Sequence, residues 1–152
     1  KIDSGDWTKG TEILISKSGT TVIACRATDM MGNVGSVVTR TVKIDRVKPE
    51  VATPKQAKAK RGGQALLRYR VTDTKPNSGK AKVVIRIKDR NGKGKLVKTL
   101  NLGQRPVKLA LQTVKFKVPM RWQRGTYRFF VYATDLAGNK QVKIASNKLV
   151  VR

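Results

Sequence analysis

The stretch GTYRFFVYATDLAGN, residues 125–139, decides the fold class of this chain. Tyr127, Phe129 and Val131 occupy alternate positions in it. Because successive side chains of a β-strand point to opposite faces, this period of two predicts a strand with these three residues turned inward. The closing Asp, Gly and Asn are residues that initiate or tolerate tight turns. We therefore expect a half-buried strand that ends in a turn.

Three other runs, residues 67–71, 83–88 and 114–118, also alternate between an apolar and a charged face. No window shows a convincing helical stripe, and DRNGKG, residues 89–94, has the composition of a turn. The sequence therefore predicts an all-β fold built from half-buried antiparallel strands. The expected strands are 50–57, 65–72, 82–89, 95–101, 112–118, 126–134 and 141–151.

The deciding stretch occurs twice. GTTVIACRATDMMGN, residues 19–33, aligns with it without a gap, and seven of the fifteen positions are identical. A separation of about 100 residues is typical of tandem sandwich domains. Pro49 and Pro54, in a Lys-rich segment without apolar periodicity, interrupt any strand ladder. We expect residues 1–48 to form the C-terminal half of one sandwich and residues 49–152 to form a complete one.

The composition is strongly basic, because 34 Lys and Arg oppose nine Asp and Glu, for a net charge of +25. Such a charge favours anionic partners. His is absent, and the single Cys excludes an intrachain disulfide and a multi-Cys zinc site. We expect no enzyme activity, catalytic residue, metal or cofactor. Cys25 aligns with Val131, so a buried, unreactive thiol is expected. No apolar run reaches the length of a membrane span.

Short motifs recur in order in both copies. In the first copy they comprise Gly19, Thr20, Ala27, Asp29, Gly32, Asn33, Val42, Ile44, Asp45 and Pro49. In the second they comprise Gly125, Thr126, Tyr127, Ala133, Asp135, Ala137, Gly138 and Asn139. This pattern resembles the bacterial Ig-like repeats of secreted and cell-surface proteins. The first copy departs from that family, because it lacks the early Asp–Ser–Gly strand and has Met30 and Met31 where a small pair is usual.

The resemblance implies tandem immunoglobulin-like β-sandwich domains, the first incomplete. It also implies a structural role as a spacer, display or adhesion module outside the cell, next to neighbouring domains of the same polypeptide. Tyr127 stands two residues before Phe129, where an antibody-type domain places its second Cys. This is the position of a tyrosine corner, whose hydroxyl bonds to the backbone of the preceding connection.

The repeated Asp-x-x-Gly-Asn motif has two interpretations. As a turn, the Asp accepts backbone N–H groups, and Gly and Asn adopt positive φ. As a calcium site, it would need six to eight oxygen ligands, to which Asp73 and Asp89 could contribute only from the same pole of the sandwich. The structural turn is the favoured interpretation. Its residues are Asp29, Gly32, Asn33, Asp135, Gly138 and Asn139.

An outward sheet face is the candidate binding surface, because it combines two aromatic rings with cations. Its residues are Arg86, Lys88, Arg128, Phe130, Tyr132 and Lys148. The competing interpretation is that the charges only keep the face solvated and block edge pairing. The expected partner is an anionic cell-wall polymer or glycan, whereas the lack of a reading element argues against specific nucleic-acid binding. Two alternatives are a carbohydrate-binding accessory domain and a filament subunit completed by a strand from another chain.

Overall fold

The computed structural model describes residues 1–89 and 94–152, which form two compact units, Lys1–Arg46 and Val47–Arg152. The described residues form strands and no helix, so the all-β prediction is confirmed. Consequently, none of them belongs to a helix that could cross a membrane. The turn predicted at 89–94 includes residues 90–93, which lie outside the described residues.

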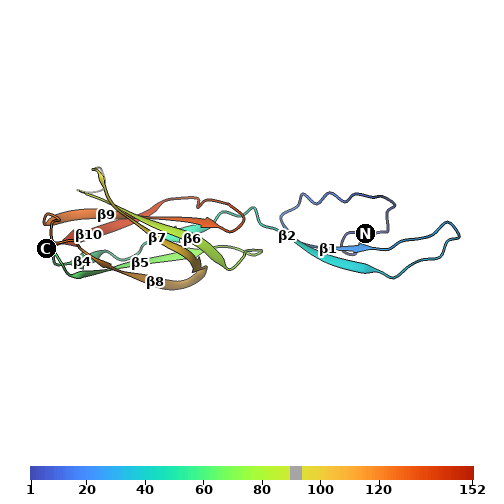
Figure 1. Ribbon diagram of the computed structural model, residues 1–152, viewed down its shortest axis with the longest axis horizontal. Coiled ribbons are helices and arrows are strands. Elements are labelled where there is room, and N and C mark those ends of the chain that lie inside the picture. Colours follow the sequence, from blue (N-terminus) through green and yellow to red (C-terminus); the bar gives the residue numbers. More distant parts are fainter. Residues whose placement is uncertain (90–93) are drawn as a thin grey trace. The chain divides into compact units, whose positions relative to one another are not determined.

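The second unit is a sandwich of two sheets (Figure 1). The larger sheet has the order β4-β10-β9-β6-β7 and the smaller one the order β3-β5-β8. Neighbouring strands are antiparallel except for the parallel pair β10–β4. The first unit contains the antiparallel pair β1–β2. The strands are β1 (Gly19–Cys25), β2 (Val38–Ile44), β3 (Glu50–Ala52), β4 (Ala57–Ala59), β5 (Gln64–Thr72), β6 (Lys80–Lys88), β7 (Leu96–Pro106), β8 (Lys108–Lys117), β9 (Gly125–Asp135) and β10 (Ala145–Val151).

The core lies between the two sheets and follows from the period of two along the strands. Leu67 of β5, Ile85 of β6 and Phe129 of β9 are fully buried, and every second residue of these strands is buried with them. They belong to one hydrophobic cluster, to which both sheets contribute side chains. Full burial of each large apolar side chain stabilises the fold by roughly 1.5–3 kcal/mol. This cluster therefore supplies the main stabilisation of the second unit.

The strand predicted at 50–57 is instead two short strands in different sheets. β3 pairs with β5 in the smaller sheet, and β4 pairs with β10 in the larger one. Pro54 lies between them and has no N–H to donate to a ladder. The carbonyl oxygen of Thr53 accepts a hydrogen bond at 2.6 Å from Asn147 Nδ2, on β10. The chain thus crosses from one sheet to the other at this point.

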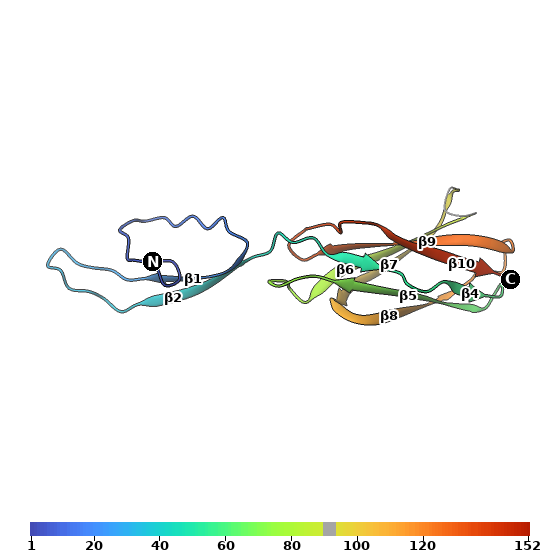
Figure 2. The same cartoon turned by 180° about the vertical axis from the view of Figure 1, so that it is seen from behind.

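The first unit contains the two-stranded sheet β1–β2 (Figure 2). Apolar side chains on this sheet, such as Val22 and Val38, are exposed. In the aligned repeat, Ile23 and Cys25 occupy the positions of Phe129 and Val131, which are fully buried. Ile23 is only half-buried, and Cys25 is exposed. The prediction of a buried thiol is therefore wrong. The reason is that, among the described residues of the first unit, no second sheet covers this face.

Candidate functional site

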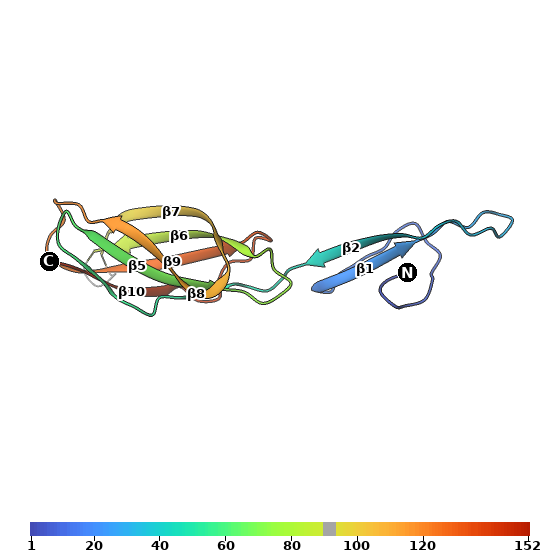
Figure 3. The ribbon, with the colours of Figure 1, turned by 90° about the horizontal axis from the view of Figure 1, so that it is seen from below.

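Strands β6, β9 and β10 are neighbours in the larger sheet of the second unit (Figure 3). The six predicted binding residues lie on one face of these strands. Each has a buried neighbour in sequence, so all six point away from the core. We call this surface the basic-aromatic face. It consists of Arg86 and Lys88 on β6, Arg128, Phe130 and Tyr132 on β9, and Lys148 on β10.

Three cations of this face form one row across the strands. Lys88 lies directly opposite Arg128, and Arg128 lies opposite Lys148. Opposed residues in antiparallel strands have Cβ atoms roughly 4.5–5.5 Å apart, and like charges at that separation are destabilising. Arg128 Nη1 donates to Ser146 Oγ at 3.0 Å, and its buried Nε has no hydrogen-bond partner among the described residues. A bound anion would relieve the repulsion within this row.

Each aromatic ring of the face has a cation above it. The guanidinium carbon of Arg86 lies 4.9 Å from the ring centre of Tyr132, and Lys88 Nζ lies 5.5 Å from that of Phe130. Contacts of this kind at exposed sites contribute roughly 0.5–1 kcal/mol. Both rings are half-buried, not freely exposed as expected from the sequence. The face therefore presents mixed aromatic and cationic surface.

A groove of about 530 Å³ opens beside Tyr132. One side of it is the segment that follows β9, which Gln141 holds in place. Gln141 N donates to the carbonyl oxygen of Ala133 at 3.1 Å, and Ala133 N donates to Gln141 Oε1 at 3.0 Å. Among the described residues, the lining includes two cations and no carboxylate, so it favours an acidic ligand. Its residues are Val84, Arg86, Tyr132, Thr134, Lys140, Gln141, Val142 and Ile144.

The sequence pattern placed part of this lining wrongly. Val142 and Ile144 were expected inside a strand at 141–151, but β10 begins at Ala145. The chain reverses at the turn after β9, and Lys140 pairs with Thr134 in a single antiparallel β-bridge. The Asp-x-x-Gly-Asn turn motif was the sequence signal that could have predicted this arrangement. A tight reversal there places the next residues beside the strand that precedes it.

A larger cleft of about 670 Å³ lies at the end of the second unit that holds Asp73. Its charged lining residues have both signs and comprise Lys48, Glu50, Asp73, Lys75 and Lys108. It contains no aromatic side chain. Because two carboxylates offset two of the three cations in this lining, the groove beside Tyr132 is the better candidate for an anion-binding site.

Asp29 and Asp135 each make the same two hydrogen bonds in the two repeated turns, and Asp29 also accepts the Met31 N–H at 2.9 Å. In each turn the Asp carboxylate accepts the backbone N–H of the Asn four residues later and its side-chain Nδ2, all at 2.8 Å. Gly32 and Gly138 have φ of 87° and 91°, in the region that favours glycine. The side-chain hydrogen bond from Asn33 lowers the pKa of the Asp29 carboxyl. These contacts account for each polar residue of the motif as part of a turn.

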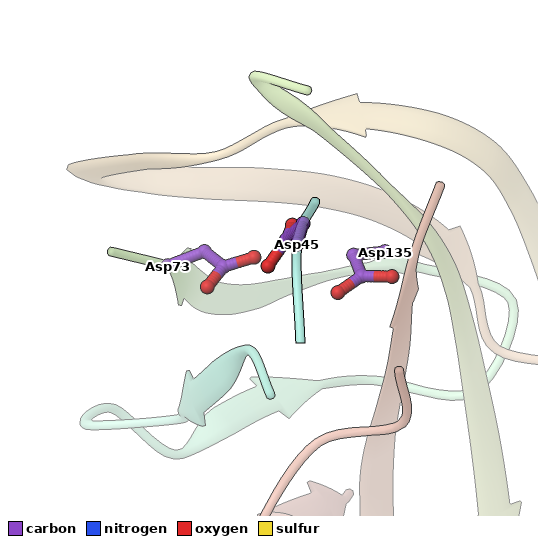
Figure 4. Close-up of side chains that lie close together, drawn as sticks. All are labelled: Asp45, Asp73 and Asp135. Carbon is purple, nitrogen blue, oxygen red and sulfur yellow. The ribbon is translucent and has the colours of Figure 1, made fainter. Parts of the chain in front are cut away.

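Asp73 and Asp135 approach each other at one pole of the second unit (Figure 4). Their nearest carboxylate oxygens lie within 4.8 Å. Figure 4 also draws Asp45, which belongs to the first unit. Asp89 lies at the other pole, because it follows Lys88, which pairs with Arg128 near the start of β9. The condition for Asp73 and Asp89 to share a calcium site is therefore not met. Both oxygens of Asp135 already accept hydrogen bonds from the turn.

Tyr127 connects β9 to the loop before it. Its hydroxyl donates to the carbonyl oxygen of Gln123 at 3.0 Å. Its ring stacks on Trp122, with ring centres 4.7 Å apart and an interplanar angle of 17°. Trp122 also packs against Phe116 of β8, so this aromatic group spans both sheets. Sequence reasoning did not single out Trp122, because it belongs to no alternating run.

No model of a protein family matches the chain, and no curated protein matches it. Among solved structures, the chain is similar to the CARDB domain of a Pyrococcus furiosus protein in complex with di-metal ions. That match has 20% identity and a TM-score of 0.40, and it covers 70% of this chain and 87% of the other. A superoxide reductase (neelaredoxin) from Ignicoccus hospitalis matches with 16% identity and a TM-score of 0.36, covering 69% and 80%. Both likenesses are too low to carry a conclusion about this chain.

Proposed function

We propose that this chain is a non-catalytic part of a secreted or cell-surface protein. In this proposal, two tandem Ig-like modules, the first incomplete, act as spacer and adhesion elements between neighbouring domains. The second module attaches by ionic contact to an anionic polymer, such as wall polymer or acidic glycan. The two-sheet sandwich of the second unit and the repeated strand and turn of the first support the tandem arrangement.

The distribution of charge is the observation that carries the ionic attachment. Residues 1–46 contain seven Lys and Arg and five Asp and Glu, a net charge of +2. Residues 47–152 contain 27 Lys and Arg and four Asp and Glu, a net charge of +23. Mutual repulsion of so many cations opposes compact folding, and at physiological salt it acts over about 8 Å. An anionic polymer on the second unit would offset this cost.

Both sheets of the second unit contribute to this charge. The larger sheet carries the basic-aromatic face, and the smaller one presents Arg68 on β5 and Lys115 and Lys117 on β8. Lys115 and Lys117 are exposed, and Arg68 is half-buried. A polymer chain therefore meets cations from several directions, which favours attachment that needs no single orientation.

Salt elution tests the ionic attachment. The chain is applied at about 50 mM NaCl to beads that carry a polyuronate, with uncharged beads of the same matrix as control. We expect retention on the polyuronate alone and complete elution well below about 1 M NaCl, because contacts that release counterions weaken steeply with salt. Retention that persists at about 1 M NaCl, or no retention at about 50 mM, would contradict the proposal.

A further inference from the structure

We propose that the groove beside Tyr132 binds a carboxylated sugar ring of an acidic polysaccharide, and that the row of Lys88, Arg128 and Lys148 holds a further acidic group of the same polymer. This inference rests on the proposed ionic attachment and assigns it a site and a ligand class. The proposed ionic attachment needs only an anion on any basic surface. The present inference adds specific recognition of a sugar ring that bears a carboxylate.

The shape of the groove fits a ring. Its volume of about 530 Å³ lies in the usual range for small-ligand sites, roughly 300–1,000 Å³. Tyr132 offers an aromatic surface, and Val142 and Ile144 offer aliphatic surface that is 61% and 55% exposed. The apolar C–H face of a sugar ring can pack against both. The Thr134 side chain also lines the groove and offers a hydroxyl to the hydroxyl groups of a sugar.

The charges of the groove favour an acidic ring over a neutral one. Within the described part of the chain, its charged lining residues are Arg86 and Lys140, and both are exposed. The Arg86 guanidinium already lies over the Tyr132 ring, at 4.9 Å from its centre. A ring that packs beside Tyr132 therefore brings its carboxylate within reach of Arg86, whose planar donors match a carboxylate.

The row of cations provides a second acidic contact on the same face. From Val84, which lines the groove, to Lys88 is four positions along β6, or about 13 Å at the usual rise per residue. A polymer that follows β6 and β9 would pass from the groove to this row. An isolated carboxylated sugar would reach only the groove, so a short polymer should bind more tightly than the monomer.

The number of aromatic side chains in the groove favours a polysaccharide over single-stranded nucleic acid. Nonspecific single-strand binding stacks successive bases on several aromatic side chains. Tyr132 is the one aromatic side chain among the described residues that line this groove, and Phe130 lies outside the lining with Lys88 above it. Such a groove holds one ring, flanked by aliphatic walls.

Calorimetric titration of the whole chain tests the inference. The probes are a short oligogalacturonate, its carboxyl-reduced analogue and a single-stranded oligothymidylate. We expect the oligogalacturonate to bind with one site per chain, and the reduced analogue to bind at least about tenfold more weakly. Binding of the reduced analogue with equal affinity would overturn the inference. The inference would also be overturned if the oligothymidylate bound more tightly than the oligogalacturonate and if Tyr132→Ala abolished that binding.

Paired variants locate the site. Arg86→Gln with Lys140→Gln should weaken oligogalacturonate binding by about tenfold or more. The matched control, Lys115→Gln with Lys117→Gln on the smaller sheet, removes the same charge and should leave the affinity within about twofold. Tyr132→Ala should also weaken binding by about tenfold, and Tyr132→Phe should weaken it less because the ring remains. Far-UV circular dichroism checks that each variant is folded.

Equal losses in both double variants would overturn the inference and leave the proposed ionic attachment standing. Failure of the wild-type chain to bind polyuronate beads at low salt would instead remove the proposed function itself. The two failures are therefore distinguishable.

Discussion

Phe129→Ala is expected to lower the free energy of unfolding of the second unit by about 3–5 kcal/mol. Phe129 is fully buried at the centre of β9, between the strand partners Ile87 and Asn147. Truncation removes its burial and leaves a cavity between two sheets that are held apart by other large side chains. Urea denaturation measures the change, followed by the fluorescence of Trp122 in a chain that carries Trp7→Phe.

The repeat provides a matched control for this variant. Ile23 occupies the aligned position in the first unit, where it is only half-buried. Ile23→Ala should change the unfolding free energy of the second unit by less than about 0.5 kcal/mol. If both variants lowered this unfolding free energy by a similar amount, the two aligned residues would not differ in packing. That result would contradict the conclusion that only the second unit forms a packed sandwich.

Amide hydrogen exchange of the whole chain should be at least about a hundredfold faster in β1 and β2 than in β6 and β9. An isolated two-stranded sheet is marginally stable in water. Thr21 and Ala24 are the buried side chains among residues 1–46, whereas the second unit holds a continuous core. Exchange followed by NMR or mass spectrometry at pH 7 measures the difference.

Slow exchange of β2 at a rate similar to β9 would contradict this prediction. If that protection fell on dilution, strands from another chain would be completing the first unit. The filament alternative would then replace the proposed spacer role. Protection that is independent of concentration would mean that the first unit is stable with two strands alone.

The sequence predicted the strands of the second unit well, because their signal is local. Tyr127, Phe129 and Val131 alternate with outward residues, and one buried face fixes the register of a strand. The same alternation predicts that Arg86, Phe130 and Tyr132 share one outward face, as the strands show. The face could be predicted because a residue's side of a sheet follows from its position in the strand.

The groove and the crossing at Pro54 could not be predicted in the same way. The groove depends on how the chain folds back after β9, which Gln141 fixes through two hydrogen bonds with Ala133. The crossing depends on which sheet β4 joins, and β4 joins the larger sheet because it pairs with β10. Cys25 shows the converse error. Its position in the repeat predicts burial, but burial also requires a covering sheet, which no local pattern reports.

NMR titration of the whole chain with a short oligogalacturonate tests the central claim most directly, because it maps the bound ligand onto individual residues. We expect saturable shift changes concentrated on Arg86, Tyr132, Lys140 and Val142, with weaker ones at Arg128 and Lys148. Shift changes spread evenly over β5, β6, β8 and β9 would contradict the assigned groove, since they would show that the polymer meets only a diffuse positive charge.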